Sequence, residues 1–220
     1  MGWVILLALV LLFWLWISDY PRAPHGEELA RLKGQQGEAL VRDILLQACR
    51  EHTGHVLSNV TLPWQGHTAQ IDHILIHPSG IFVFEVKHRS GEVHAVWNHP
   101  TWTQVTPRGY YEFQNPLFQN QTHVRAVAAL FPEGRVVFPV TGRVVLTGDA
   151  QLTPNWPAGV YRASELLSLL RQEHRTALTA EMMYTCLRRI EAIRNPATKR
   201  TERQHIAYVK SVQRRLNSHR

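Results

Sequence analysis

The sequence is poor in cysteine and contains no internal repeat or low-complexity tract. Only Cys49 and Cys186 occur among its 220 residues, far apart in the chain. This excludes a disulfide scaffold and a cysteine-rich zinc site, and it is compatible with a reducing compartment. Hydrophobic residues make up 45% of the chain, which is enough for a packed core and excludes a wholly disordered protein. The length suits one medium domain with appendages.

Acidic residues are also scarce, and the resulting positive charge is concentrated near the C-terminus. The chain has 17 Asp and Glu against 24 Lys and Arg, a formal net charge of +7. Residues 188–220 contain ten basic and two acidic residues, a net +8, so the first 187 residues sum to −1. A near-neutral body with a basic end indicates an anionic partner there, either nucleic acid or a lipid surface. A solvated basic helix is the alternative explanation.

A long uncharged segment lies at the N-terminus. Residues 2–17 hold no charged side chain and are almost entirely Trp, Val, Ile, Leu, Ala and Phe. As a helix they would be about 24 Å long, close to the roughly 30 Å of a bilayer core, and residues 18–20 extend them. A cleaved signal peptide is the alternative, but no Lys or Arg precedes the segment and no small-residue cleavage site follows it. We therefore expect residues 1–20 to be an uncleaved transmembrane anchor.

The flanking charges predict the orientation of this anchor. Arg22, Arg31 and Lys33 follow the apolar segment, so the positive-inside rule places the N-terminus outside and the body in the cytoplasm. We expect a single-pass protein, in a bacterium at the inner membrane. Residues 21–26 carry two prolines and a glycine, which is typical of a juxtamembrane linker.

The body alternates helical and strand-like patterns, which predicts a mixed α/β sheet covered by helices. Phe82, Val83 and Phe84 form a continuous apolar run, typical of a central strand buried on both faces. Asn115 followed by Pro116 is typical of a helix start with Asn as N-cap, and this helix should end near residue 130. Other helices are expected at residues 27–51, 164–172, 180–194 and 198–216. Strands are expected at residues 55–62, 69–77, 81–87, 92–97, 136–138, 142–147 and 159–161, with a hairpin over 102–113.

Acidic residues interrupt two of the apolar strands. Side chains alternate along a strand, so Glu85 and Lys87 should point to the same side, about 7 Å apart. Asp72 lies in the preceding strand and can face Glu85 across the ladder. Two buried carboxylates about 5 Å apart would repel by roughly 3 kcal/mol at an effective dielectric of about 20. A divalent cation removes that penalty, and oxygen ligands favour Mg²⁺ or Mn²⁺ over zinc.

Each candidate residue also has an ordinary structural explanation. Glu85 with Lys87 fits a surface pair at a strand end, and Asp72 fits a carboxylate paired with a neighbouring Arg or His. Glu38 lies on an apolar flank of the first helix, where it could face the sheet or solvent. Gln119 lies near a helix N-terminus, where free backbone N–H groups favour a phosphate, and a capping or surface amide is the alternative.

Several short motifs resemble, in order, those of the nuclease-related domain (NERD) family. They are Gly37-Glu38 with Val41, residues 70–76 (QIDHILI), 80–87 (GIFVFEVK), 91–93 (GEV), Trp102, 115–120 (NPLFQN) and 144–148 (VVLTG). This family is grouped with the PD-(D/E)-x-K nucleases. The resemblance therefore implies an α/β, restriction-endonuclease-like core of helix, antiparallel strand meander, helix and strand.

The resemblance also divides the chain. It covers residues 34–150, the nuclease-like domain, which would follow a transmembrane anchor (1–20) and a juxtamembrane linker with the helix start (21–33). A helical extension (151–195) and a basic C-terminal helix (196–220) would complete the chain.

The resemblance implies a role for each candidate residue. Asp72 and Glu85 would bind the metal ion, and Lys87 would orient the attacking water or stabilise charge. Accessory roles are implied for Glu38 and Gln119.

Our hypothesis adds a third metal ligand, the backbone carbonyl of Val86. Bound Mg²⁺ or Mn²⁺ would polarise a phosphodiester and lower the pKa of a bound water. The thirteen histidines show no metal-ligand spacing and are assigned no role, although His123 lies one turn beyond Gln119 on the same face. The last helix would present four basic side chains to nucleic-acid phosphates or anionic lipid head groups: Arg203, Lys210, Arg214 and Arg215.

The sequence thus predicts a membrane-tethered, metal-dependent nuclease, with DNA as the favoured substrate. One alternative is a noncatalytic membrane-anchored module that binds nucleic acid or a partner, and another is a membrane assembly factor. The complete set of Asp72, Glu85 and Lys87 weighs against a degenerate site. No motif distinguishes DNA from RNA or endonuclease from exonuclease action. A homodimer is suggested only because many enzymes that cut both strands work as pairs of subunits.

Overall fold

The structure, a computed structural model, describes residues 26–131, 138–154 and 156–196. The chain divides into two compact units, Met1–Lys33 and Gly34–Arg220. The expected anchor at residues 1–20 lies outside the described residues, as does the basic C-terminal helix with Arg203, Lys210, Arg214 and Arg215. Within the described residues, no helix has both the length and the apolar character needed to cross a membrane.

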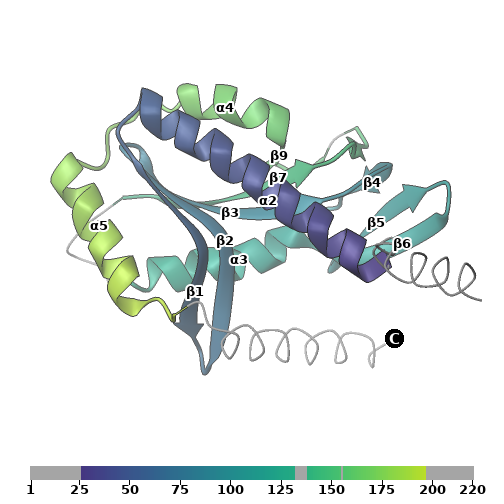
Figure 1. Ribbon diagram of the computed structural model, residues 1–220, viewed down its shortest axis with the longest axis horizontal. Helices are drawn as coiled ribbons and strands as arrows, with labels where there is room; N and C mark the ends of the chain where they lie inside the picture. The colour runs from purple at the N-terminus through teal and green to yellow at the C-terminus, as the bar shows by residue number, and fades with distance from the viewer. Residues whose placement is uncertain (1–25, 132–137, 155, 197–220) are drawn as a thin grey trace, which may run out of the picture. The chain divides into compact units, whose positions relative to one another are not determined.

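The described elements follow the expected order (Figure 1). Strand β4 is shorter than expected, β8 was not expected, and part of the short strand expected at 136–138 lies outside the described residues. The elements are α2 (Gly26–Glu51), β1 (His55–Trp64), β2 (His67–His77), β3 (Gly80–His88), β4 (Glu92–His94), β5 (Thr101–Thr106), β6 (Gly109–Gln114), α3 (Pro116–Ala128), β7 (Val140–Thr147), β8 (Gln151–Leu152), β9 (Val160–Arg162), α4 (Ala163–Arg171) and α5 (Ala180–Ile193).

The strands form two sheets, which confirms the mixed α/β class. The larger sheet has the order β1-β2-β3-β7-β9, and the smaller one has the order β6-β5-β4-β8. Strands β1, β2 and β3 are antiparallel, whereas β7 pairs in parallel with both β3 and β9. The segment after residue 150 therefore contributes two short strands, β8 and β9, as well as two helices. Strand β3 is central, as its continuous apolar run predicted.

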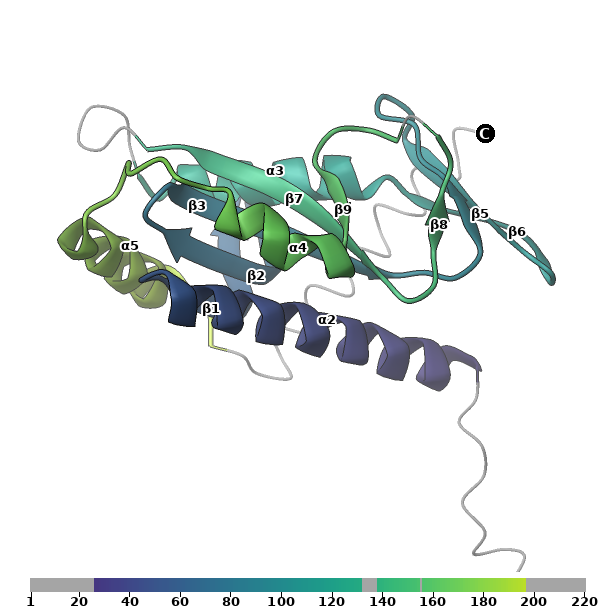
Figure 2. The same ribbon diagram turned by 90° about the horizontal axis from the view of Figure 1, so that it is seen from above.

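Helices cover both faces of the larger sheet (Figure 2). Ile81 and Val83 of β3 pack in one cluster with residues of α3 and α5, including Val127 and Ile190. The intervening Phe82, Phe84 and Val86 pack on the opposite face against α2 and α4. Because strand side chains alternate, Glu85 and Lys87 continue the row of Ile81 and Val83 toward the side covered by α3.

Strands β1 and β2 share an irregularity beside this row. Their pairing runs from Ser58 opposite His73 directly to Val60 opposite Ile71, so Asn59 and Asp72 are left out of the register. Asn59 adopts a φ of 52°, a conformation that Asn tolerates better than most residues. Ile71 and Ile74, three residues apart, belong to the same core cluster, so the alternation of β2 shifts by one residue around Asp72.

Asn115 begins α3, as the sequence predicted, but its side chain does more than cap the helix. Its Oδ1 accepts a hydrogen bond from the N–H of Leu117 at 2.9 Å. Its Nδ2 donates to the carbonyls of Val96, Trp97 and His99, at 3.2, 3.1 and 2.7 Å. The fully buried Asn115 therefore joins the start of α3 to the loop between β4 and β5.

Replacing Asn115 with Asp is expected to lower the free energy of unfolding by about 2–4 kcal/mol, although Asp normally equals Asn as an N-cap. The new carboxylate would face three carbonyl oxygens that now receive an N–H donor. Urea denaturation at pH 7 measures the loss. The control is Thr179→Asp at the exposed N-cap of α5, where the change should stay within about 0.5 kcal/mol. Equal effects at the two caps would contradict the bridging role of Asn115.

Candidate active site

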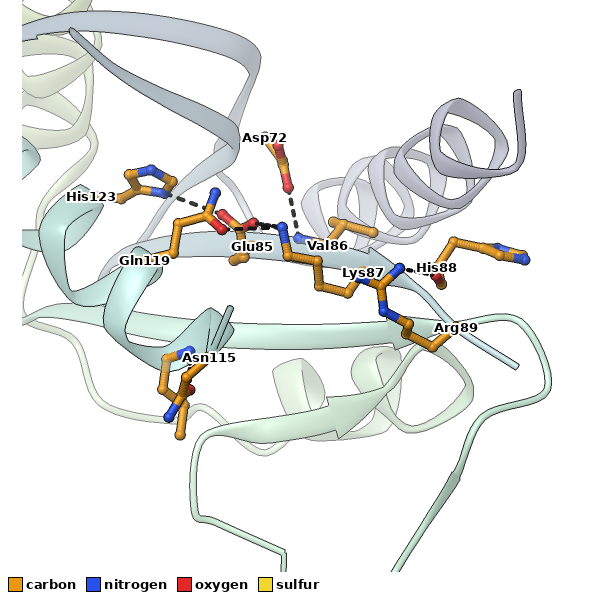
Figure 3. Close-up of polar contacts among 10 residues, drawn as sticks. Asp72, Glu85, Val86, Lys87, His88, Arg89, Asn115, Gln119 and His123 are labelled. Carbon is orange, nitrogen blue, oxygen red and sulfur yellow. Dashed lines mark hydrogen bonds and ion pairs between the residues drawn. The ribbon is translucent and has the colours of Figure 1, made fainter. Parts of the chain in front are cut away.

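Glu85 and Lys87 lie together at the C-terminal end of β3. The Glu85 Oε1 and Lys87 Nζ atoms are 2.5 Å apart, and the Glu85 side chain is only 2% exposed (Figure 3). The Lys87 side chain is 23% exposed, so the pair sits at the boundary between core and solvent. A surface ion pair, the ordinary explanation from the sequence, does not describe a carboxylate buried this deeply.

Asp72 approaches the same place from β2. The pairing of β2 with β3 ends at His73 opposite Phe84, so Asp72 and Glu85 are the next residues on the two strands. The Asp72 carboxylate accepts a hydrogen bond from the backbone N–H of Val86 at 2.7 Å (Figure 3). It thereby replaces a ladder partner where the two strands separate, rather than pairing with an Arg or His as the alternative explanation proposed.

Glu38 is brought to this cluster by a close contact between α2 and β7. A Cβ atom on Gly37 would lie 2.3 Å from Thr147 Oγ1, so a larger residue would force the helix or the Thr147 side chain to move. The neighbouring backbone carbonyl of Glu38 accepts a hydrogen bond from His73 Nε2 at 3.0 Å. Since Nε2 is the donor, Nδ1 accepts from Ser58 Oγ at 2.9 Å. Burial lowers the pKa of His73 to about 4, which keeps this ring neutral at pH 7.

Helix α3 supplies two polar contacts to the pair on β3 (Figure 3). Gln119 Oε1 accepts a hydrogen bond from Lys87 Nζ at 3.1 Å. One turn later, the buried His123 places Nδ1 3.3 Å from Glu85 Oε2, although without good hydrogen-bond geometry. Asn120, between them in sequence, donates from Nδ2 to the Val83 carbonyl at 3.0 Å and fixes the helix on β3.

Burial and neighbouring charges shift the pKa values of the four residues in opposite directions. Burial, and then the charge of Glu85, raise the pKa of Asp72 well above its usual range. The same two causes raise the pKa of Glu38. Burial also opposes the charge of Glu85, but Lys87 and His123 more than offset it, so the pKa of Glu85 is lowered. The pKa of Lys87 is raised, because Glu85 and Asp72 outweigh its burial.

The donors present suit a hard divalent cation. Glu85 Oε2 is buried without a hydrogen-bond partner among the described residues, and Asp72 and Glu38 carry raised pKa values that an added positive charge would lower. In the described part of the chain, no three His, Cys, Asp or Glu side chains are already arranged as a metal cluster. Mg²⁺ does not require one, because it is usually held by one or two carboxylates, with waters and substrate phosphates completing its shell.

The sequence had assigned no role to two histidines that contact these residues. His123 could have been found from its four-residue spacing from Gln119, which places both on one face of α3. His73 follows Asp72 in a buried strand, but its partners on α2 and β1 are distant in sequence. Only the packing of three elements brings them together.

The comparisons agree with the motifs. A family model for the nuclease-related domain matches residues 33–147. An uncharacterized protein of Bacillus anthracis is 36% identical over 108 residues, which cover 49% of this chain and 50% of that protein. The chain thus spans about half the length of this relative. No solved structure matches the chain.

Proposed function

The chain belongs to the nuclease-related domain family, and on that premise we propose that it is a membrane-tethered, metal-dependent nuclease. It would hydrolyse phosphodiester bonds of nucleic acid, with DNA favoured, on a restriction-endonuclease-like core. Residues 1–20 would anchor it in a membrane, the bacterial inner membrane, with the body in the cytoplasm. The single observation that supports catalysis best is the convergence of Asp72, Glu85 and Lys87 at the end of β3.

The excess of acid in this cluster is what supports a metal ion. Burial, and then the charge of Glu85, raise the pKa values of Glu38 and Asp72, and a cation bound beside them would favour their charged forms. Asp72, Glu85 and the carbonyl of Val86 would hold Mg²⁺ or Mn²⁺. The bound ion would polarise the phosphodiester and lower the pKa of a water molecule.

The other side chains would position and balance charge. Lys87 would offset the negative charge that grows on the phosphate in the transition state. Gln119, through its hydrogen bond with Lys87, would fix the direction of that ammonium group. His123 would hold Glu85 in place, and Glu38 would contribute negative charge from α2.

The terminal segments would direct the domain to its partners. The basic residues Arg203, Lys210, Arg214 and Arg215 would contact nucleic-acid phosphates or anionic lipid head groups. A homodimer stays a prediction. The competing proposal is a noncatalytic, membrane-anchored module that binds nucleic acid or a partner with the same fold.

Cleavage by the full-length, detergent-solubilised protein separates these proposals. Labelled duplex DNA, single-stranded DNA and RNA are incubated with Mg²⁺, Mn²⁺ or EDTA. We expect divalent-dependent cleavage, and Asp72→Asn should lower its rate by about 10²–10³-fold because it removes a charged oxygen ligand while keeping the shape.

The matched control is Asp43→Asn, an exposed acid on α2 that pairs, within the described structure, with the adjacent Arg42. It makes the same chemical change away from the cluster and should leave the rate within about twofold. If the wild-type protein and Asp72→Asn release the same products at the same rate, or neither responds to divalent ions, the noncatalytic module is the better account.

A further inference from the structure

We propose that Arg89 binds a phosphate of the nucleic acid, the one next to the phosphodiester that is cut. The inference rests on the proposed function, and it adds a substrate contact that neither the motifs nor the metal ligands include. Three observations support it: the position of Arg89, its lack of an acidic partner among the described residues, and its rigid support.

Arg89 follows directly on the strand that carries the catalytic candidates. Its backbone N–H donates to the Thr147 carbonyl at 3.0 Å, which continues the parallel pairing of β3 with β7 beyond His88. Because side chains alternate, Arg89 follows Glu85 and Lys87 in the same row. Arg89 is therefore two residues beyond Lys87 at the same end of β3, and both side chains are drawn in Figure 3.

The two cations differ in their partners. Lys87 is paired with Glu85, whereas no carboxylate among the described residues forms an ion pair with Arg89. Its Nη1 donates to the adjacent His88 carbonyl at 3.0 Å, and its buried Nε has no hydrogen-bond partner in the described part of the chain. Burial of a guanidinium without an acid costs free energy, and an anionic ligand would offset that cost.

The guanidinium is also held in one orientation. Its Cζ atom lies 4.2 Å from the centroid of the Phe113 ring on β6. Phe113 packs edge-to-face on Trp102, with ring centroids 6.1 Å apart, and Trp102 is fully buried. Stacking fixes the plane of the guanidinium and hence the direction of its remaining N–H groups, and arginine is well suited to bind phosphate. Arg89 thus resembles a prepared anion contact next to Lys87.

Binding to DNA without turnover tests this assignment. Full-length protein carrying Asp72→Asn is titrated in EDTA against a fluorescein-labelled 20-base-pair duplex, at several salt concentrations. Adding Arg89→Met should raise Kd about 10-fold. It should also reduce the magnitude of the slope of log K against log salt by about 1, the value for one lost phosphate contact. The effect should be equal for unrelated sequences, since a phosphate contact reads no base.

Arg42→Met is the matched control, because Arg42 is an exposed arginine on α2 with a 50% exposed side chain. It should change Kd less than about twofold. Arg89→Lys, which retains the charge but not the planar fork, should keep the salt slope and raise Kd about 3-fold. This milder variant also provides the test if Arg89→Met does not fold.

The outcomes are distinct from those of the cleavage experiment. If Arg89→Met or Arg89→Lys binds like its parent, or loses no more affinity than Arg42→Met, the assignment is overturned even where the protein cuts DNA. If no metal-dependent cleavage occurs but Arg89→Met weakens binding as described, the nuclease proposal fails and the phosphate contact stands. Absence of any nucleic-acid binding overturns the role of Arg89.

Discussion

Replacing Lys87 with methionine is expected to lower metal-dependent cleavage by at least about 10²–10³-fold and to destabilise the fold by about 3 kcal/mol. The two losses have different causes. Activity falls because Lys87 would no longer offset charge on the reacting phosphate. Stability falls because Glu85, with a 2% exposed side chain, would lose the ammonium group that contacts it at 2.5 Å. We take the lower end of the range for a broken buried ion pair, since Lys87 itself is partly exposed.

A double variant separates catalysis from folding. Glu85→Gln/Lys87→Met removes both members of the pair, so no uncompensated charge of the pair stays buried. Its free energy of unfolding in EDTA should return to within about 1 kcal/mol of the wild type, while cleavage stays undetectable. Urea denaturation and the cleavage assay measure the two quantities on the same preparations. If Lys87→Met unfolds no more easily than the wild type, the ion pair has been assigned the wrong energetic role.

Replacing Gly37 with alanine is expected to destabilise the protein by about 1–3 kcal/mol, although alanine favours helices over glycine. The added methyl group would lie 2.3 Å from Thr147 Oγ1, which is closer than any real contact of this kind. Helix α2 would have to move away from β7, and Glu38 would move with it. We therefore expect cleavage to fall as well, because Glu38 is one of the acids in the cluster.

Two further variants test this explanation. Gly34→Ala lies on the same helix with nothing within 4 Å of the new Cβ, so it should stabilise the protein by about 0.5–1 kcal/mol. In a Thr147→Ala background, where the obstructing oxygen is absent, Gly37→Ala should cost less than about 1 kcal/mol. Thermal and urea denaturation give these values. A loss of equal size in both backgrounds would show that the contact with Thr147 is not the cause.

The sequence predicted the secondary structure because its signals are local. Alternating and continuous apolar runs placed β1, β2 and β3, and Asn115-Pro116 placed the start of α3. The two-residue strand β8 was missed, since so short an element depends on its partner β4 rather than on its own pattern. The irregularity at Asn59 and Asp72 was missed for a similar reason, because it involves two paired strands at once.

The candidate site was also predictable only where its residues lie close together in the sequence. The spacing of Glu85 and Lys87 determined that they share one face of a strand, and the motifs determined the family. The sequence alone could not show that Gln119 contacts Lys87, that His123 contacts Glu85, or that His73 joins Asp72's strand to α2.

What the sequence determined by itself is therefore most of the elements, the family, and the main candidates for chemistry, since these follow from patterns within one segment. What only the tertiary structure decided is which of those residues meet, which charges lack a partner among the described residues, and why a side chain at Gly37 would meet Thr147. Such contacts join segments far apart in the chain, and their energies depend on burial, which exists only once α2, α3 and the sheet have packed together.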